Sequence, residues 1–299
     1  MATFEELLER TSRTFALAVP LLPSPIREQV GLAYLLLRIA DTLEDAEHWS
    51  GERRVQELIR FAHVVQQRDP AEAEAFRDAM AADSPTAHAG YRELLAHTPE
   101  VIAALEALPA APRGVVVKHV QMTVEGMAST VERMGTDGRL SLRSLEELRR
   151  YCYVVAGLVG ELLTELFLIA APSLLRAAST LRRRAREFGE GLQLTNILKD
   201  SDADAAQGRR YLPAGVNRPA VFSLARADLE SAAAFVNALF EHGAPKGIWA
   251  FAALPLRLAQ ATLALVEAQG ASAKLSRERV AEMLAALQTA QTPSAFLSA

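Results

Sequence analysis

The chain has 299 residues, of which 50% are hydrophobic and 23% are charged, and its formal net charge is -4. The apolar content is enough for a large buried core, whereas the lack of a basic excess argues against nucleic acid as a partner. The single cysteine, Cys152, excludes an internal disulfide and favours a reducing, cytoplasmic compartment.

Most of the chain is expected to be helical. Ala, Leu, Glu and Arg are abundant, and apolar residues recur every three or four positions, which predicts an all-α protein with about eight or more helices. No long linker or fixed repeat separates the segments, so residues 1–299 are predicted to form a single domain. Gly, Pro and small polar residues predict chain breaks at 20–25, 83–85, 109–114, 135–138, 171–173, 213–219 and 243–247.

No apolar run is long enough to predict a membrane span. The most apolar stretches, 151–160 and 247–256, continue for about ten residues before a charge, whereas a transmembrane helix needs roughly 18 to 20. The amino terminus also lacks the basic and then apolar pattern of a signal peptide. We therefore expect a cytoplasmic protein without a transmembrane segment.

A polar stripe is embedded in the apolar helix predicted at residues 34–45. At about 100° per residue, its four members face one direction. They are Tyr34, Arg38, Asp41 and Asp45.

The same pattern recurs at residues 193–204, where the stripe consists of Gln193, Asn196, Asp200 and Asp204. In both segments the last two members are aspartates four residues apart. A short basic turn that includes Arg209 comes after the second stripe and is able to reach an anion.

The paired aspartates need an explanation, because like charges at this spacing repel by a few tenths of a kcal/mol. A solvated acidic face would explain either pair alone, but the polar residues upstream of both pairs favour a metal site. Mg²⁺ takes oxygen ligands, often one or two carboxylates completed by phosphate oxygens and water. Phosphate-loop, dinucleotide and Glu-x-x-His patterns do not occur, which disfavours a kinase, a classical Rossmann enzyme and a di-iron bundle.

At these motifs the sequence resembles the squalene and phytoene synthase family. The opening motif of that family is similar to residues 12–15, its two acidic motifs to 34–45 and 193–213, and its middle motif to 151–160. Within the family, residues 37–45 and 251–263 are more similar to squalene synthases than to phytoene synthases.

The resemblance implies an isoprenoid synthase fold, with helices around a central apolar cavity, and a Mg²⁺-dependent enzyme. The implied reaction is head-to-head condensation of two farnesyl diphosphates through presqualene diphosphate to squalene, with NADPH as the reductant. Such an apolar product would be a precursor of hopanoids, sterols or carotenoids, and peripheral contact with the inner face of a membrane stays open. The oligomeric state is not predicted.

Three alternatives stay open. The same fold could stop at dehydrosqualene, presqualene diphosphate or hydroxysqualene, or the chain could be a phytoene synthase. A non-catalytic helical interaction module is the alternative from a different class, because it could carry the same stripes as solvated faces.

The resemblance also assigns roles to individual residues. Tyr151 is expected at the reacting centre, together with the four aspartates. The Mg²⁺ ligands would be Asp41, Asp45, Asn196, Asp200 and Asp204. Substrate would be bound by Ser12, Arg13, Phe15, Tyr34, Arg38, Gln193, Asn196, Lys199 and Arg209. NADPH would be bound by Asn196, Lys274 and Arg277.

Further residues are expected near the cavity or depart from the family pattern. Ala156, Gly157 and Gly160 either leave room for a prenyl tail or make a close helix contact, and Phe251 and Leu254 would line or back the cavity. Lys199 stands where the family usually has arginine, so a charge is kept but the planar fork of donors is not. An ordinary core position is the alternative for Tyr151, and surface ion pairs are the alternative for the arginines.

Overall fold

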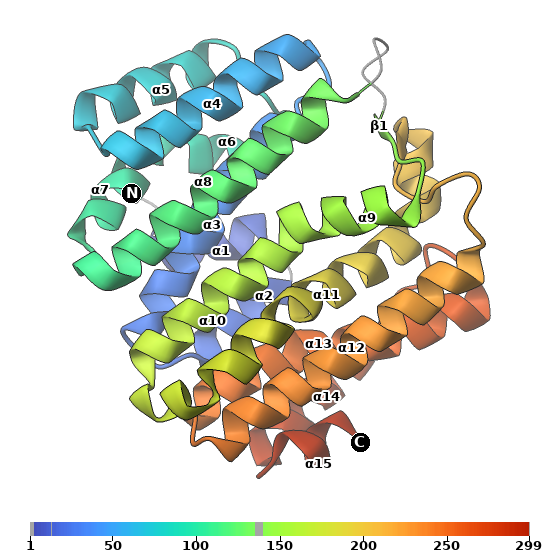
Figure 1. The fold of residues 1–299 in the computed structure, drawn as a ribbon. Coiled ribbons are helices and arrows are strands. Elements are labelled where there is room, and N and C mark those ends of the chain that lie inside the picture. Colours follow the sequence, from blue (N-terminus) through green and yellow to red (C-terminus); the bar gives the residue numbers. More distant parts are fainter. Residues whose placement is uncertain (1–2, 13, 135–139, 299) are drawn as a thin grey trace. The chain divides into compact units, whose positions relative to one another are not determined.

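The computed structural model describes residues 3–12, 14–134 and 140–298, and they are almost entirely α-helical, as predicted (Figure 1). The chain divides into two compact units, one formed by Met1–Pro20 with Ser24–Gly138 and the other by Leu21–Pro23 with Arg139–Ala299. The expectation of a single domain over residues 1–299 stays a prediction.

In the first unit, some of the helix starts are capped by short polar side chains. Ser50 accepts a hydrogen bond from the backbone N–H of Arg53, and Asp69 accepts from Ala71, which satisfies amides at the helix starts. α3 and α4 both pack against α8, and α6 packs against α1 and α3. The helices are α1 (Phe4–Thr11), α2 (Thr14–Ala18), α3 (Ile26–Glu44), α4 (Gly51–Gln67), α5 (Pro70–Ala82), α6 (Ala89–Ala96), α7 (Thr98–Ala107) and α8 (Ala110–Glu132).

The second unit is organised around its longest helix, α11, which packs against α10, α12 and α13. Figure 1 shows α11 and α12 running beside each other through this unit. Stacked Phe188 and Phe235, with ring centroids 5.1 Å apart, fill the α11–α12 contact. The helices are α9 (Leu145–Cys152), α10 (Leu158–Ala170), α11 (Ala178–Ala206), α12 (Arg218–Glu241), α13 (Lys246–Gln269), α14 (Arg277–Thr289) and α15 (Pro293–Leu297).

Three kinds of short element complete the fold. A π-helical turn, Tyr153–Gly157, joins α9 to α10, and 3₁₀ turns occupy Val19–Leu21 and Pro172–Ala177. Two two-residue strands, β1 (Leu140–Ser141) and β2 (Arg209–Arg210), pair in parallel, with Leu140 opposite Arg209.

The helices agree with the prediction of about eight or more, but some of the breaks between them lack Gly and Pro and were not predicted. α4 ends at Arg68, which takes a left-handed conformation with φ of 56°, and α6 and α7 are separated only at His97. α3 ends at Glu44, so Asp45 is its C-cap instead of a member of the last turn.

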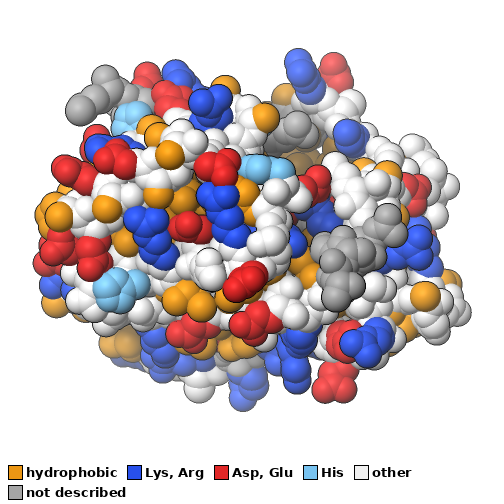
Figure 2. Space-filling view, turned by 90° about the horizontal axis from the view of Figure 1, so that it is seen from above, with side chains coloured by type: hydrophobic (Ala, Val, Ile, Leu, Met, Phe, Trp, Pro, Cys, Tyr) orange, Lys and Arg blue, Asp and Glu red, His pale blue; other side chains and the backbone are white. Residues whose placement is uncertain are grey.

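The helical stretch Leu145–Ala170 and helix α13 are long and apolar enough to cross a membrane by length and composition alone. This is weak evidence for a span, because 56% and 61% of their apolar windows are buried inside the protein, as in a core helix. The sequence expectation counted only the ten-residue apolar runs, which lie within these longer helices. On the face seen in Figure 2, acidic and basic side chains are intermingled.

Candidate active site

The first acidic motif forms one connected network on α3. Nη1 of Arg38 lies 3.2 Å from Oδ2 of Asp41, and Nε of Arg38 donates to the hydroxyl of Tyr34 at 3.1 Å. The Tyr34 hydroxyl in turn donates to the carbonyl oxygen of Thr11 at 2.7 Å. The spacing of four residues predicted this common face, and the structure confirms it for three of the four members.

The opening motif reaches the same network from α1 and α2. Oγ of Ser12 accepts a hydrogen bond from the backbone N–H of Phe15 at 3.0 Å, and the ring of Phe15 stacks on Tyr34 with centroids 5.3 Å apart. Arg13 lies outside the described residues. Ser12, Phe15 and Tyr34, which the sequence assigned separately to substrate binding, are therefore neighbours.

Burial shapes the charges of this network. It raises the pKa of Asp41 to about 6, against the opposing effect of Arg38 and with a smaller contribution from Asp45. Burial alone would lower the pKa of Arg38, but Asp41 and the two tyrosines Tyr34 and Tyr91 outweigh it, so the pKa is raised. Arg38 therefore stays a cation. Sequence reasoning missed Tyr91, since it lies on α6 and no local pattern relates it to α3.

The second acidic motif lies on α11, and its burial resembles that of the first, in which Tyr34, Arg38 and Asp41 are half-buried and Asp45 is exposed. Gln193, Asp200 and Asp204 are half-buried and Asn196 is exposed. Nζ of Lys199 lies 3.1 Å from Oδ2 of Asp200, so the residue that replaces the usual arginine pairs with the expected metal ligand.

The donors present on α3 and α11 fit Mg²⁺. Within the parts of the chain that the structure describes, no three His, Cys, Asp or Glu side chains come together as a complete metal cage. Each acidic motif instead offers two aspartate carboxylates, and Mg²⁺ is commonly held by one or two carboxylates while phosphate and water supply the other ligands.

Tyr151 is nearly buried at the end of α9 and lies against Tyr211. Their ring centroids are 4.8 Å apart and their hydroxyl oxygens are 3.3 Å apart. Tyr211 comes two residues after Arg209, the first residue of β2. The middle motif and the end of the second acidic motif thus meet within one unit, which the sequence did not predict.

The middle motif is not a regular helix, because its residues 153–157 form the π-helical turn. Such turns occur often at functional sites. At Gly160 an added Cβ would lie 1.9 Å from the carbonyl oxygen of Ala185, so α10 and α11 touch backbone to backbone. Of the two interpretations of Gly160, the close helix contact is the one found. Phe251 and Leu254 are both fully buried in the same unit.

A buried ion network lies between α9, α11 and α12 and was not predicted. Glu190 is fully buried and forms salt bridges with Arg149, at 3.2 Å, and with Arg186. Arg149 also lies 3.8 Å from Asp228. Burial raises the pKa of Asp228 to about 6, with Arg149 opposing and Glu190 adding to the shift. The buried thiol of Cys152 adjoins this network, and burial, Glu190 and Asp228 all raise its pKa.

The carboxy-terminal cations lie on a segment attached to α11. The backbone N–H of Ser272 donates to the carbonyl oxygen of Lys199 at 2.7 Å. Lys274 and Arg277, which come next on the same segment, are exposed. The contact attaches these two exposed cations to the helix that bears Asp200.

Comparison with known proteins agrees with these motifs. Residues 8–220 match the model of the squalene/phytoene synthase family. A squalene synthase of Gibberella zeae is 32% identical over 211 residues, which cover 69% of this chain and 42% of that protein. The chain therefore spans less than half the length of this curated relative.

Solved structures show the same fold. A structure described as TcSQS with the ligand BPH1237 gives a TM-score of 0.78 at 24% identity and covers 98% of this chain and 88% of that one. A dehydrosqualene synthase in complex with a ligand gives a TM-score of 0.60 at 20% identity and covers 96% and 94%. The family match at residues 8–220 extends over more than half of this chain. The chain therefore belongs to the squalene/phytoene synthase family.

Proposed function

We propose that this chain is a prenyltransferase that condenses two farnesyl diphosphates head to head, through presqualene diphosphate, and reduces the product to squalene with NADPH. The observation that carries the proposal is that both acidic motifs of the family occur here as paired aspartates, each with a cation beside it. Arg38 lies 3.2 Å from Asp41, and Lys199 lies 3.1 Å from Asp200.

The proposed metal ligands are Asp41, Asp45, Asp200 and Asp204, with Asn196 as an additional oxygen donor. Bound Mg²⁺ would withdraw charge from the leaving diphosphate and so lower the barrier to cleavage of its C–O bond. Arg38 would donate its planar fork of N–H groups to the diphosphate oxygens. Lys199 and Arg209 would add further positive charge beside the second acidic motif.

Tyr151 is the residue that we propose at the reacting carbons. Its ring face would stabilise the allylic cation formed when diphosphate departs. The near-complete burial of Tyr151 supports this role, because a cation that is kept from water is not quenched. Tyr211, which stacks against Tyr151, would hold the ring of Tyr151 in place.

Reduction to squalene is the finer part of the proposal. Lys274 and Arg277 would bind the phosphates of NADPH, which supplies hydride when it is bound. The same fold stopping at dehydrosqualene, presqualene diphosphate or hydroxysqualene is the second candidate. Lys199 favours it, since lysine cannot make the bidentate diphosphate contact of the usual arginine.

Product analysis tests the proposal. Purified protein is incubated with farnesyl diphosphate and Mg²⁺, with and without NADPH, and pyrophosphate and extracted lipids are quantified. We expect pyrophosphate release that requires Mg²⁺, and squalene only when NADPH is present. If an unreduced product forms in the presence of NADPH, the enzyme stops before squalene, as the second candidate proposes. If no condensation product forms at all, the proposed activity is refuted.

Matched variants connect the activity to the aspartates. Asp41→Asn and Asp200→Asn remove one metal-binding charge each, and we expect kcat/KM to fall by at least about 100-fold, the scale of losing one electrostatic contributor in a site. Asp202→Asn is the control, because Asp202 is exposed on α11 and points away from the stripe at about 100° per residue. Equal losses in all three variants would contradict the assignment.

A further inference from the structure

Tyr91 contacts the guanidinium group of Arg38 from outside the acidic motif. Cζ of Arg38 lies 5.4 Å from the ring centroid of Tyr34 and 5.5 Å from that of Tyr91. Both distances are within the roughly 6 Å at which a cation is attracted to an aromatic ring face. Tyr34 precedes Arg38 by one helical turn, whereas Tyr91 belongs to α6. Arg38 is therefore held by rings from two different helices.

The position of Tyr91 is fixed because α6 lies unusually close to α1. An added Cβ at Gly90 would lie 2.7 Å from the carbonyl oxygen of Arg10, an approach that only glycine allows. Arg10 also forms a salt bridge with Glu93 on the next turn of α6. Nδ1 of His88 accepts the backbone N–H of Tyr91 at 3.3 Å, which caps α6 at its first turn.

The same helix α1 also fixes the other ring. Its last residue, Thr11, accepts the hydroxyl hydrogen bond of Tyr34 at 2.7 Å. The two rings that contact Arg38 are thus both positioned relative to α1, Tyr34 through this hydrogen bond and Tyr91 through the packing of α6. The guanidinium of Arg38 also contacts the Tyr34 hydroxyl and Asp41.

We infer that Tyr91 is a positioning residue for Arg38, which keeps the guanidinium in place for an incoming diphosphate. The inference rests on the proposed function, in which Asp41 binds metal and Arg38 binds the substrate. If Asp41 held a metal, Arg38 would lose its ion partner, whereas its contacts with the two rings would remain. A side chain that is ordered before the ligand arrives loses less conformational entropy on binding, so Tyr91 acts on substrate affinity.

Two substitutions at Tyr91 distinguish the effect of its aromatic ring face from the effect of its side-chain volume. Tyr91→Leu removes the aromatic face, whereas Tyr91→Phe keeps it. With farnesyl diphosphate and Mg²⁺, we expect Tyr91→Leu to raise KM roughly five- to tenfold, the scale of a partly desolvated cation–π contact, while kcat changes by less than about twofold. Tyr91→Phe should restore KM to within about twofold of the parent protein. Unchanged kinetics in Tyr91→Leu, or an equal loss in Tyr91→Phe, would overturn the inference.

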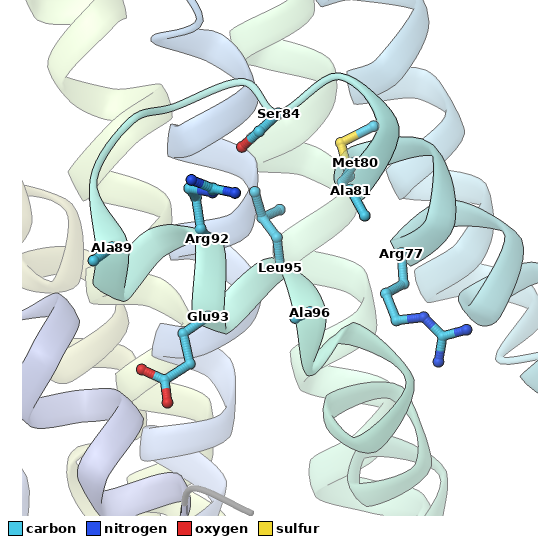
Figure 3. Close-up of a pocket in the computed structure, with 9 residues that line it drawn as sticks. All are labelled: Arg77, Met80, Ala81, Ser84, Ala89, Arg92, Glu93, Leu95 and Ala96. Carbon is cyan, nitrogen blue, oxygen red and sulfur yellow. The ribbon is translucent and has the colours of Figure 1, made fainter.

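Arg92→Gln is the control on the same helix. Arg92 is exposed and lines a separate cavity of about 370 Å³ between α5 and α6, together with Met80, Ser84 and Leu95 (Figure 3). A change there tests whether any substitution on α6 disturbs the site, and we expect KM to stay as in the parent. A rise in KM equal to that of Tyr91→Leu would overturn the inference.

A measurement without substrate distinguishes failure of the inference from failure of the proposed function. If the parent protein releases no pyrophosphate, the proposed function fails, and the contact is then tested in thermal unfolding. The variants are Tyr91→Leu, Arg38→Met and the two combined. Coupled residues predict a Tm loss in the double variant smaller than the sum of the single losses. Additive losses would overturn the inference, and Tyr91→Gln replaces Tyr91→Leu if that variant does not fold.

Discussion

Tyr151 and Tyr211 lie ring against ring, with centroids 4.8 Å apart and planes inclined by 30°. The pair joins the end of α9 to the residue just after β2, across 60 positions of sequence. Arg209 also pairs with Leu140 on the adjacent strand. The ring contact and the strand pairing together fix the basic turn relative to the middle motif.

Loss of the Tyr211 ring should lower both stability and turnover. We expect Tyr211→Leu to reduce the free energy of unfolding by about 1 kcal/mol more than Tyr211→Phe, the worth of an aromatic pair beyond its buried area. Urea denaturation measures this difference. In the pyrophosphate assay the same variant should lower kcat more than it raises KM, since Tyr151 would lose its support. Equal stability of the Leu and Phe variants would show that the stacking contributes nothing.

The helix contact at Gly160 predicts a large effect from one methyl group. A Cβ there would meet the Ala185 carbonyl oxygen at 1.9 Å, so Gly160→Ala must push α10 away from α11. We expect a loss of about 2–3 kcal/mol in the free energy of unfolding, at the upper end for overpacked cores.

Gly114→Ala is the matched control for that substitution. Gly114 lies inside α8 and an added Cβ would meet no atom within 4 Å. Because alanine favours helix over glycine, this variant should gain about 0.5–1 kcal/mol. Thermal or urea unfolding of both proteins checks the pair, and a stable Gly160→Ala protein would contradict the close contact.

The buried carboxyl of Asp228 predicts that stability falls as pH rises through the acidic range. Burial raises its pKa from 3.8 to about 6, with Arg149 and Arg186 opposing and Glu190 and Glu187 adding to the shift. The folded state therefore binds this proton more tightly than the unfolded chain, and the stabilisation is lost between about pH 4 and pH 6. The shift corresponds to at most about 3 kcal/mol.

Removing this carboxyl should flatten the pH dependence. Relative to the parent protein, Asp228→Asn should become more stable as pH rises through the same window, from about 4 to about 6, measured by urea unfolding at each pH. Asp83→Asn should show the opposite trend, since a hydrogen bond from Arg53 lowers the pKa of Asp83, and its stabilisation is present at neutral pH and lost in acid. The same trend in both variants would contradict the assignment.

The contact between Ser272 and Lys199 predicts an effect on the reductant alone. Ser272 has φ of 67° and donates its N–H to α11, and proline can provide neither this dihedral angle nor the N–H. Ser272→Pro should therefore raise KM for NADPH and leave pyrophosphate release without NADPH unchanged.

Ser272→Gly provides the comparison, because glycine adopts the left-handed conformation without strain and retains the amide. It should keep KM for NADPH at the parent value in the squalene assay. If Ser272→Pro also leaves that value unchanged, the segment with Lys274 and Arg277 does not bind the reductant.

Features that depend on helical periodicity are well predicted from the sequence. Spacings of three and four residues predict that Tyr34, Arg38 and Asp41 share one face, because one turn of helix is enough to relate them. The all-α class is predicted by the same periodicity.

Pairings between helices could not be predicted in this way. The contacts of Tyr91 with Arg38 and of Glu190 with Arg149 depend on how α6 meets α3 and how α9 meets α11, which no local pattern encodes. The π-helical turn at 153–157 was missed for the same reason, since it lies where α11 packs closely.

The chemistry of Cys152 makes the chain convenient for spectroscopic labelling. Its thiol is fully buried and its pKa is raised, so maleimide reagents, which require an accessible thiolate, should leave it unmodified. Cysteines introduced at exposed positions such as Glu47, after α3, and Asp202, on α11, would then be the reactive ones. A pair of spin labels at these two positions would report the separation of the two aspartate-bearing helices in solution, with and without Mg²⁺ and a diphosphate, and no native side chain would have to be masked first.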